Sequence, residues 1–394
     1  MRVAILGAGP AGLYLGYLLK RRRPKTHVRV VEQNRADATF GFGVVFSDRA
    51  LEFLEEDDAA TYDAIAPQLE TWHDIAIVHR GERIAIDGVG FAAVGRLRLL
   101  EVLQQRARSV GVDLEYGRRI ERIEALDGAD LVVGADGANS LVRENFAREL
   151  GAEVAHLSNR FAWFGTSRRF ETLTQTFRSA EFGQCSAHHY RYAPDMSTFI
   201  VELDAESFAR GGFARLSEDE AKSICERVFA EDLGGHPLIS NRSIWRQFPN
   251  VRNARWSHGK YVLIGDALHT AHFSIGSGTR LAMEDAIALD RALAQHPRDL
   301  RAALQSFEAS RRPILEKLLA AADLSARWYE RFADHMTLAP IDLAMSYVMR
   351  SGRIDLERLR KLSPRFVARW ERERGASSRA VVPGPERSSG TRDP

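Results

Sequence analysis

The chain of 394 residues is poor in cysteine and lysine, and each shortage narrows the possible functions. Its two cysteines, Cys185 and Cys225, lie far apart and outside any Cys-x-x-Cys pair, so the sequence predicts neither a disulfide framework nor a metal site. Such usage is typical of a reducing compartment, and we expect the cytoplasm. Only 6 of the 55 cationic residues are lysine, so a single arginine is weak evidence for a phosphate site. The net charge of +2 predicts no nucleic-acid partner.

Long apolar runs are also missing. The longest, 3–19, is interrupted by Gly7, Gly9 and Gly12, and its cationic block at 20–23 follows it. A signal peptide carries its charges before the apolar run, and a membrane span needs about 20 apolar residues. We therefore expect a soluble protein with no membrane partner. A content of 45% hydrophobic and 27% charged residues is typical of globular proteins, and this length predicts two domains.

A glycine motif opens the chain. The apolar strand expected at 3–6 is followed by Gly7-Ala8-Gly9-Pro10-Ala11-Gly12 and an apolar helix to about residue 19. This is G-x-G-x-x-G in the context that dinucleotide binding requires. A second strand at 28–31 leads to Glu32, 20 residues beyond Gly12, where a carboxylate meets an adenosine ribose hydroxyl. Because a carboxylate disfavours a ribose 2′-phosphate, the motif leaves NAD and FAD open.

Two further strand–turn–helix motifs follow. Residues 261–264 predict a buried strand that leads into Gly265-Asp266 and then a helix start at Gly276-Ser277-Gly278. Asp266 can accept a hydrogen bond from a sugar-like hydroxyl, and the glycine backbone can approach a flat ring closely. The segment 134–143, GADGANSLVR, also follows a strand and starts a helix. Its Asp136 either contacts a nucleotide or only forms an Asx-type turn and cap.

In this order the three motifs resemble the FAD fingerprints of the single-component FAD-dependent aromatic hydroxylases. The resemblance implies that NAD(P)H, with NADH favoured, binds transiently, because no second G-x-G-x-x-G is present. It implies a monooxygenase in which O2 adds to reduced FAD and the C4a-hydroperoxide hydroxylates an aromatic ring. The implied cofactor contacts are Gly7, Gly9, Pro10, Ala11, Gly12, Glu32, Gln33, Gly43, Val44, Arg96, Ile120, Asp136, Gly265, Asp266, Ala267, Gly276, Ser277 and Gly278.

The segment 272–276, HFSIG, has Phe273 where the family usually has proline. With 43–48, GVVFSD, it is similar to the branch containing salicylyl-CoA 5-hydroxylases and the violacein-pathway tryptophan hydroxylases, and more to the former. This branch implies an aromatic acyl-CoA thioester, salicylyl-CoA, hydroxylated at C5 to gentisyl-CoA. Anthraniloyl-CoA or a tryptophan-derived indole stays an alternative substrate. A different-class alternative is a non-catalytic, regulatory FAD-binding protein; a flavin-dependent halogenase is disfavoured because W-x-W-x-I-P is missing.

Candidates for the substrate side rest on residue chemistry. A histidine can take the phenol proton at neutral pH, and we expect this role of His272 or His189. Arg168, Arg169 and Arg191 are candidates for the CoA phosphates. The expected substrate contacts are Phe46, Trp163, Tyr190, Phe273 and Ser274.

The expected fold class is α/β, with a Rossmann-like FAD-binding domain, a mixed β-sheet substrate domain and C-terminal helices. The FAD-binding domain should occupy 1–155, with an excursion around 45–90, and return at 256–296. The substrate domain should occupy 156–255 and the helical region 297–375. Residues 376–394, rich in Ser, Gly, Pro and Arg, predict a disordered tail. We expect a monomer or homodimer.

Overall fold

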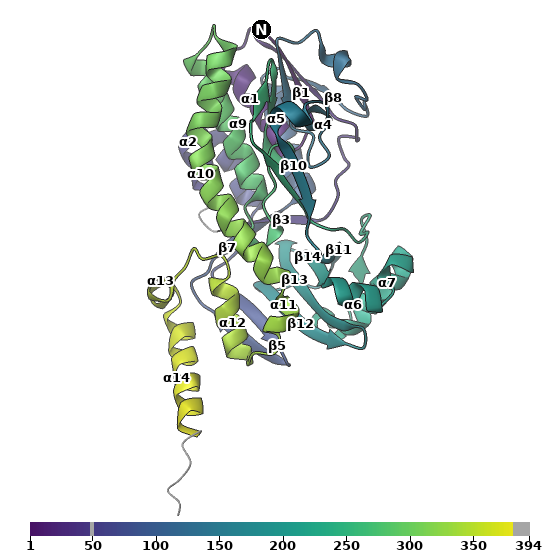
Figure 1. The fold of residues 1–394 in the computed structure, drawn as a ribbon, viewed down its shortest axis with the longest axis vertical. Coiled ribbons are helices and arrows are strands. Elements are labelled where there is room, and N and C mark those ends of the chain that lie inside the picture. Colours follow the sequence, from purple (N-terminus) through teal and green to yellow (C-terminus); the bar gives the residue numbers. More distant parts are fainter. Residues whose placement is uncertain (48–50, 381–394) are drawn as a thin grey trace, which may run out of the picture.

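The computed structural model describes residues 1–47 and 51–380, with side chains to residue 375 (Figure 1). In Figure 1, the part that holds β1, β8, α1 and α9 lies above the part that holds β5 and β11–β14, and α10 runs along both. Within the described residues, no helix combines the length and apolar character that a membrane crossing needs. The same residues contain no cluster of three or more His, Cys, Asp or Glu suited to a metal ion.

A six-stranded sheet forms the centre of the upper part. Its neighbouring strands run parallel, except for β17, which is antiparallel to β18. Its strands are mostly buried on both faces, as expected of a parallel sheet covered by helices, and this confirms the predicted α/β class. The order is β17 (Ser257–His258), β18 (Tyr261–Leu263), β9 (Leu131–Gly134), β1 (Arg2–Leu6), β2 (His27–Val31) and β8 (Asp113–Glu115).

A seven-stranded mixed sheet forms the lower part. All its pairs are antiparallel except β12 with β5, which run parallel. Because β5 and β6 come from the excursion expected around 45–90, this sheet combines strands from two distant stretches of the chain. The order is β15 (Leu238–Ile239), β11 (Arg160–Thr166), β14 (Met196–Leu203), β13 (Gly183–Ala193), β12 (Leu173–Ala180), β5 (Ile75–His79) and β6 (Glu82–Ile86).

Two small sheets join these parts. One consists of β3 (Gly43–Ser47), β7 (Phe91–Gly95) and β4 (Glu70–Trp72), and β3 and β7 contact β13 of the large sheet. The other pairs β10 (Ala152–His156) with β16 (Pro249–Asn253). Both therefore lie where the chain passes between the two large sheets.

Helices cover both sheets. Helix α1 (Pro10–Arg22) packs against β1 and β2 of the parallel sheet, α3 (Arg96–Ser109) and α9 (Gly278–Gln295) pack against α1, and α10 lies along α9. On β5 and β6 lies α12, whose apolar face is buried with these strands. The other helices are α2 (Glu52–Ile65), α4 (Leu141–Asn145), α5 (Ala147–Leu150), α6 (Ala205–Arg210), α7 (Glu218–Val228), α8 (Ala230–Leu233), α10 (Leu300–Tyr329), α11 (Phe332–His335), α12 (Pro340–Met349), α13 (Leu356–Leu362) and α14 (Pro364–Ala380).

The last helix corrects one boundary. Residues 376–380 continue α14, whereas the sequence predicted disorder from 376. The reason is that a helix, once nucleated by the buried Phe366 and Val367, gains a hydrogen bond with each added residue. The rest of the predicted tail, 381–394, lies outside the described residues.

Candidate functional site

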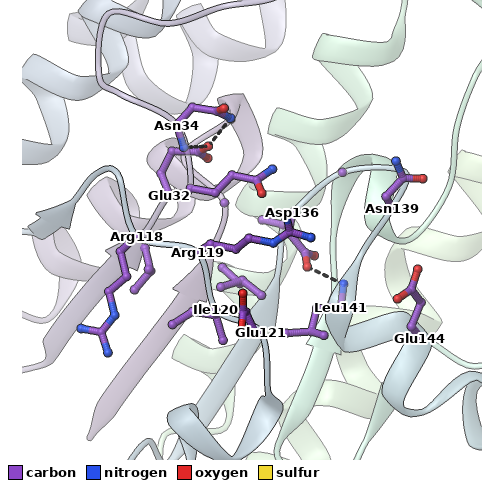
Figure 2. Close-up of a pocket in the computed structure, with 17 residues that line it drawn as sticks. Glu32, Asn34, Arg118, Arg119, Ile120, Glu121, Asp136, Asn139, Leu141 and Glu144 are labelled. Carbon is purple, nitrogen blue, oxygen red and sulfur yellow. Dashed lines mark hydrogen bonds between the residues drawn. The ribbon is translucent and has the colours of Figure 1, made fainter.

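Two cavities meet at the carboxyl ends of β1 and β9, the edge of a parallel sheet where ligands usually bind. The first, of about 550 Å³, lies beside Glu32 and Asp136 (Figure 2). The second, of about 690 Å³, reaches the seven-stranded sheet. Gly9, Ala135 and Gly137 line both cavities, so the two form one elongated site.

The glycine turn after β1 forms one wall of this site. Gly7 has φ +101°, and a Cβ there would lie 2.3 Å from the Ala135 carbonyl oxygen. A Cβ at Gly12 would lie 2.0 Å from the Gly7 carbonyl oxygen. These two glycines let β1, α1 and β9 pack closely. Gly9 differs, because its side-chain position is open and faces both cavities, so a ligand can approach the backbone at the start of α1.

Glu32 stands at the end of β2 with its carboxylate fixed. Its Oε2 accepts a hydrogen bond from the Ala8 backbone nitrogen at 2.9 Å. Its Oε1 accepts from the Asn34 backbone nitrogen at 2.9 Å and from Asn34 Nδ2 at 2.7 Å (Figure 2). Gln33 and Ile120 line the same cavity. The carboxylate is therefore held in place before any ligand arrives.

Asp136 lies across this cavity from Glu32, after β9. Its Oδ2 accepts a hydrogen bond from the Leu141 backbone nitrogen at 2.7 Å, as Figure 2 shows, while the buried Oδ1 has no partner. Burial raises the pKa of this carboxyl, and hydrogen bonds from Ser140 and Leu141 oppose the rise. Both readings of Asp136 from the sequence thus have support, since one oxygen caps a turn and the other is available to a ligand.

Asp266 and Arg96 line the second cavity. Asp266 is exposed to the cavity but enclosed by protein on its other sides, and this desolvation raises the pKa of its carboxyl, against the charges of His269 and Arg96. Arg96 begins α3, and its buried Nε has no hydrogen-bond partner. Desolvation lowers the pKa of Arg96, against the charge of Asp266. Both side chains keep hydrogen-bonding capacity for a ligand.

A buried carboxylate holds the turn that carries Asp266. Asp285 Oδ2 accepts from the Gly265 backbone nitrogen at 3.0 Å and lies 2.7 Å from His269 Nε2. Its Oδ1 accepts from Arg311 Nε at 2.9 Å. Although burial opposes it, the charges of His269 and Arg311 lower the pKa of Asp285. Gly265 and Ala267, on either side of Asp266, are thus buried and hold its position without lining the cavity.

The second glycine turn closes the other end. After the short 3₁₀ turn Phe273–Ile275, Gly276 adopts φ +58°, and 276–278 line the cavity at the start of α9. The open side-chain position of Gly278 lets a ligand approach the helix N-terminus. His272 and Ser274 turn inward instead, with His272 Nδ1 lying 2.8 Å from Ser274 Oγ.

Aromatic side chains from the seven-stranded sheet and from this turn line the second cavity. Trp163, Tyr190 and Phe273 line the second cavity together with Phe161. The Tyr190 hydroxyl donates to the Gly43 carbonyl oxygen at 2.9 Å, which fixes its ring.

Two neighbouring histidines of β13 face opposite ways. His189 packs against Phe170 and Phe199, with ring centroids 4.0 and 5.1 Å away, and its Nε2 lies 3.0 Å from Thr176 Oγ1. His188 instead lines the second cavity, and neither of its buried ring nitrogens has a hydrogen-bond partner. Burial, helped by the charge of Arg350, lowers the pKa of His188 to about 3, so its ring is neutral.

Sequence reasoning missed His188, because either histidine could face the ligand. Strand alternation offered a signal, since His188 stands two residues from Tyr190, a predicted substrate contact that does line the cavity. Arg246 was also missed; it is exposed and lines the cavity. Of the arginines considered for phosphates, Arg191 is held by Glu70 at 2.7 Å.

The predicted residues divide as follows. Neither catalytic candidate, His272 or His189, lines either cavity. The predicted residues that do line them are Gly7, Gly9, Pro10, Ala11, Glu32, Gln33, Gly43, Val44, Arg96, Ile120, Asp136, Trp163, Tyr190, Asp266, Phe273, Gly276, Ser277 and Gly278. Those that do not are Gly12, Phe46, Gly265, Ala267 and Ser274.

The residues present fit FAD. A fixed carboxylate at one end and a glycine turn at a helix N-terminus suit a ribose and a pyrophosphate. At the other end, Asp266 and the backbone at 276–278 suit a hydroxylated chain and a flat ring. The unpaired Asp136 Oδ1 at the first end and Arg96 Nε at the second need partners that a ligand can provide.

Comparison with known proteins agrees with this geometry. A family model described as an FAD binding domain matches residues 1–322. Salicyloyl-CoA 5-hydroxylase of a Streptomyces species is 42% identical over 361 residues, which cover 89% of this chain and 70% of that protein. The 3-hydroxy-4-methyl-anthranilyl-(aryl-carrier protein) 5-monooxygenase of Streptosporangium sibiricum is 36% identical, covering 85% of this chain and 90% of its own.

Protodeoxyviolaceinate monooxygenase of Chromobacterium violaceum is 33% identical and covers 89% of this chain and 94% of its own length, which confirms the predicted relation to the violacein branch. Among solved structures, tetrameric 2-methyl-3-hydroxypyridine-5-carboxylic acid oxygenase superposes with a TM-score of 0.69. The superposition covers 92% of this chain and 95% of the oxygenase chain, and at 18% identity it shows a shared fold. The relatives are monooxygenases and hydroxylases by name, which favours an enzyme over a regulatory protein.

Proposed function

Because the chain belongs to the FAD-dependent aromatic monooxygenases, we propose that it hydroxylates an aromatic acyl thioester, salicylyl-CoA, at C5 with NAD(P)H and O2. The observation that carries this proposal is the second cavity, which the backbone of 276–278 and several aromatic side chains line together. Its support comes from the relatives, since two of them are named for aromatic acyl groups held on CoA or on a carrier protein.

On the cofactor side, this chain's residues bind and orient. Glu32 would accept from the adenosine ribose, and the start of α1 would meet the pyrophosphate. Asp266 would accept from the ribityl hydroxyls, and the backbone of 276–278 would face the flavin ring. When bound and reduced by NAD(P)H, FAD would activate O2, of which one atom enters the aromatic ring and the other leaves as water.

On the substrate side, the aromatic side chains of the second cavity would orient the substrate's aromatic ring and shield it from water. Trp163, Tyr190 and Phe273 would enclose it and exclude water. The neutral His188 would accept a hydrogen bond from the 2-hydroxyl, which increases electron donation to the para carbon, C5. A thioester also brings no carboxylate charge into this apolar wall, as a free acid would. The CoA moiety would leave the cavity past the exposed Arg246, whose charge suits a phosphate.

NADH is the proposed reductant, binding transiently. A monomer or homodimer in the cytoplasm remains our expectation for its assembly and location.

The test compares substrates under identical conditions. NADH consumption and product mass are followed with salicylyl-CoA, anthraniloyl-CoA, free salicylate and a tryptophan-derived indole. We expect coupled gain of one oxygen atom with salicylyl-CoA, and a product with the hydroxyls para to each other. Hydroxylation of free salicylate without reaction of the thioester would contradict the substrate while leaving the monooxygenase intact. Preference for anthraniloyl-CoA would move the assignment to an amino-substituted ring.

A further inference from the structure

Arg350 is the C-cap residue of α12, and its side chain contacts the turn that contains Ser274. Its Nη2 donates to the Ser274 carbonyl oxygen at 2.7 Å, and its Nε donates to Ser325 Oγ at 3.0 Å. Its Nη1 donates to the Tyr347 carbonyl oxygen at 2.7 Å, and the guanidinium carbon lies 3.8 Å from the Tyr347 ring centroid. All three guanidinium nitrogens are therefore engaged, and the stacked ring fixes their plane.

The hydrogen bonds continue into the turn. Ser274 Oγ lies 2.7 Å from Ser325 Oγ and 2.8 Å from His272 Nδ1. These three side chains are buried, so water does not compete for the bonds. The turn that leads directly to Gly276 is thus tied to α10 and α12 by a closed set of side chains. Its cavity side, by contrast, is formed by Phe273 and 276–278.

Among the described residues, Arg350 is held by neutral groups rather than by a carboxylate. Its hydrogen-bond acceptors are oxygens of Ser274, Ser325 and Tyr347, and its side chain is half-buried. Its charge adds to burial in lowering the pKa of both His188 and His272. Arg350 therefore lies close to the cavity wall and favours the neutral form of the two histidines.

We propose that Arg350 is a positioning residue that clamps the turn 272–276 from behind and so sets where Gly276–Gly278 stand relative to the substrate wall. The family match ends at residue 322, so this clamp comes from a part of the chain that the match does not reach. The role in oxygen transfer rests on the proposed function. A loosened turn would displace the flavin-facing backbone, and even a small displacement of reacting groups lowers coupling.

The test uses the full-length, FAD-loaded protein and two variants. Arg350→Lys keeps the charge but loses the planar fork, and Ser325→Ala removes the hydroxyl that joins Arg350 to Ser274. Arg327→Lys, the same change at an exposed position of α10, is the control. The readouts are amide hydrogen exchange of 272–278, the visible absorption band of bound flavin, and the ratio of hydroxylated product to hydrogen peroxide.

We expect exchange in 272–278 to be about tenfold faster in Arg350→Lys, the effect of losing one charge-assisted hydrogen bond, and less so in Ser325→Ala. The flavin band should shift, and hydrogen peroxide should rise at the expense of product, while Arg327→Lys matches the wild type. Wild-type exchange at 272–278 in either variant would overturn the clamp. Faster exchange with an unchanged flavin band and product ratio would overturn its positioning role.

If Arg350→Lys does not fold, the same measurements on Ser325→Ala test the proposed role of Arg350. If the wild type does not hydroxylate salicylyl-CoA, the proposed substrate fails. In that case, the amide hydrogen exchange of 272–278 and the absorption band of bound flavin still test the role of Arg350.

Discussion

The two walls of the cavity are built on different principles. The cofactor wall consists of backbone at strand ends and helix starts, as at Gly9 and Gly278, with a few fixed carboxylates. The substrate wall consists of side chains from β11, β13 and β14, among them Trp163 and His188. A change in the first wall should therefore remove FAD, whereas a change in the second should leave FAD bound and alter the product.

The largest effect should come from Asp266. We expect Asp266→Ala to purify largely free of flavin, because the cavity loses an ionised acceptor that no other side chain replaces. The ratio of flavin absorption to protein absorption measures this loss. Asp266→Asn, which keeps one carbonyl acceptor, should retain more flavin. Full flavin occupancy in Asp266→Ala would contradict the placement of this end of the cofactor.

A change at His188 should have the opposite pattern. We expect His188→Leu to keep its flavin but to hydroxylate about 100-fold more slowly, since the phenol loses its proposed hydrogen-bond partner. His189→Leu is the matched control, because His189 faces away from the cavity. Single-turnover product formation separates the two variants. Equal losses in both would remove the distinction between the faces of β13.

A smaller loss should follow from Glu32→Gln. The neutral amide can still accept one hydrogen bond but offers a weaker acceptor than the carboxylate that now bonds the Ala8 and Asn34 nitrogens. We expect about tenfold weaker FAD binding by titration of the flavin-free protein, with unchanged product per bound flavin. A change in product ratio at normal affinity would mean that this end of the cavity also affects the chemistry.

The smallest effect concerns acid. Burial lowers the pKa of His188 and of His272 to about 3, against about 6.5 in the unfolded chain. Above pH 6.5 both states are neutral and neither histidine affects stability. As the pH falls below that value, the unfolded state binds protons that the folded state refuses, so stability is lost until about pH 3.

Between pH 7 and 5.5 this linkage corresponds to about 1 kcal/mol per histidine. Urea unfolding of His188→Leu should therefore depend less on pH than that of the wild type. An identical dependence would mean that His188 is protonated as easily in the folded protein as in the unfolded one.

The sequence predicted the cofactor wall better than the substrate wall, for a physical reason. Gly9, Glu32, Asp266 and 276–278 belong to short segments in which local geometry requires particular residues, and the structure places all of them at the cavity. The substrate wall depends on which face of a strand a residue occupies. Without the register of β13 against β14, only the two-residue spacing from Tyr190 distinguishes His188 from His189 in the sequence.

Long-range packing also explains why some predicted residues do not line the cavity and why another residue was missed. Phe46 follows the cavity-lining Val44 and Val45 on β3 but is buried in the core instead. Ser274 lies beside the lining residue Phe273 but bonds to Ser325, which is distant in sequence. Arg350 belongs to no motif, and only the packing of α12 brings it to the turn. Long-range contacts of this kind are not encoded in a local pattern.

The alternation of the chain between its two large sheets has a consequence for folding. One edge of β5 pairs only with β12, and one edge of β9 pairs only with β18, and both partners come much later in the chain. Such distant pairings make folding slow, because loop closure is costly before the contacts form. During synthesis, β5 and β6 emerge as a hairpin with two unpaired edges, of which β12 later covers one, and exposed edges aggregate. A fragment ending at residue 155 should therefore precipitate, while the full chain refolds through a long-lived intermediate.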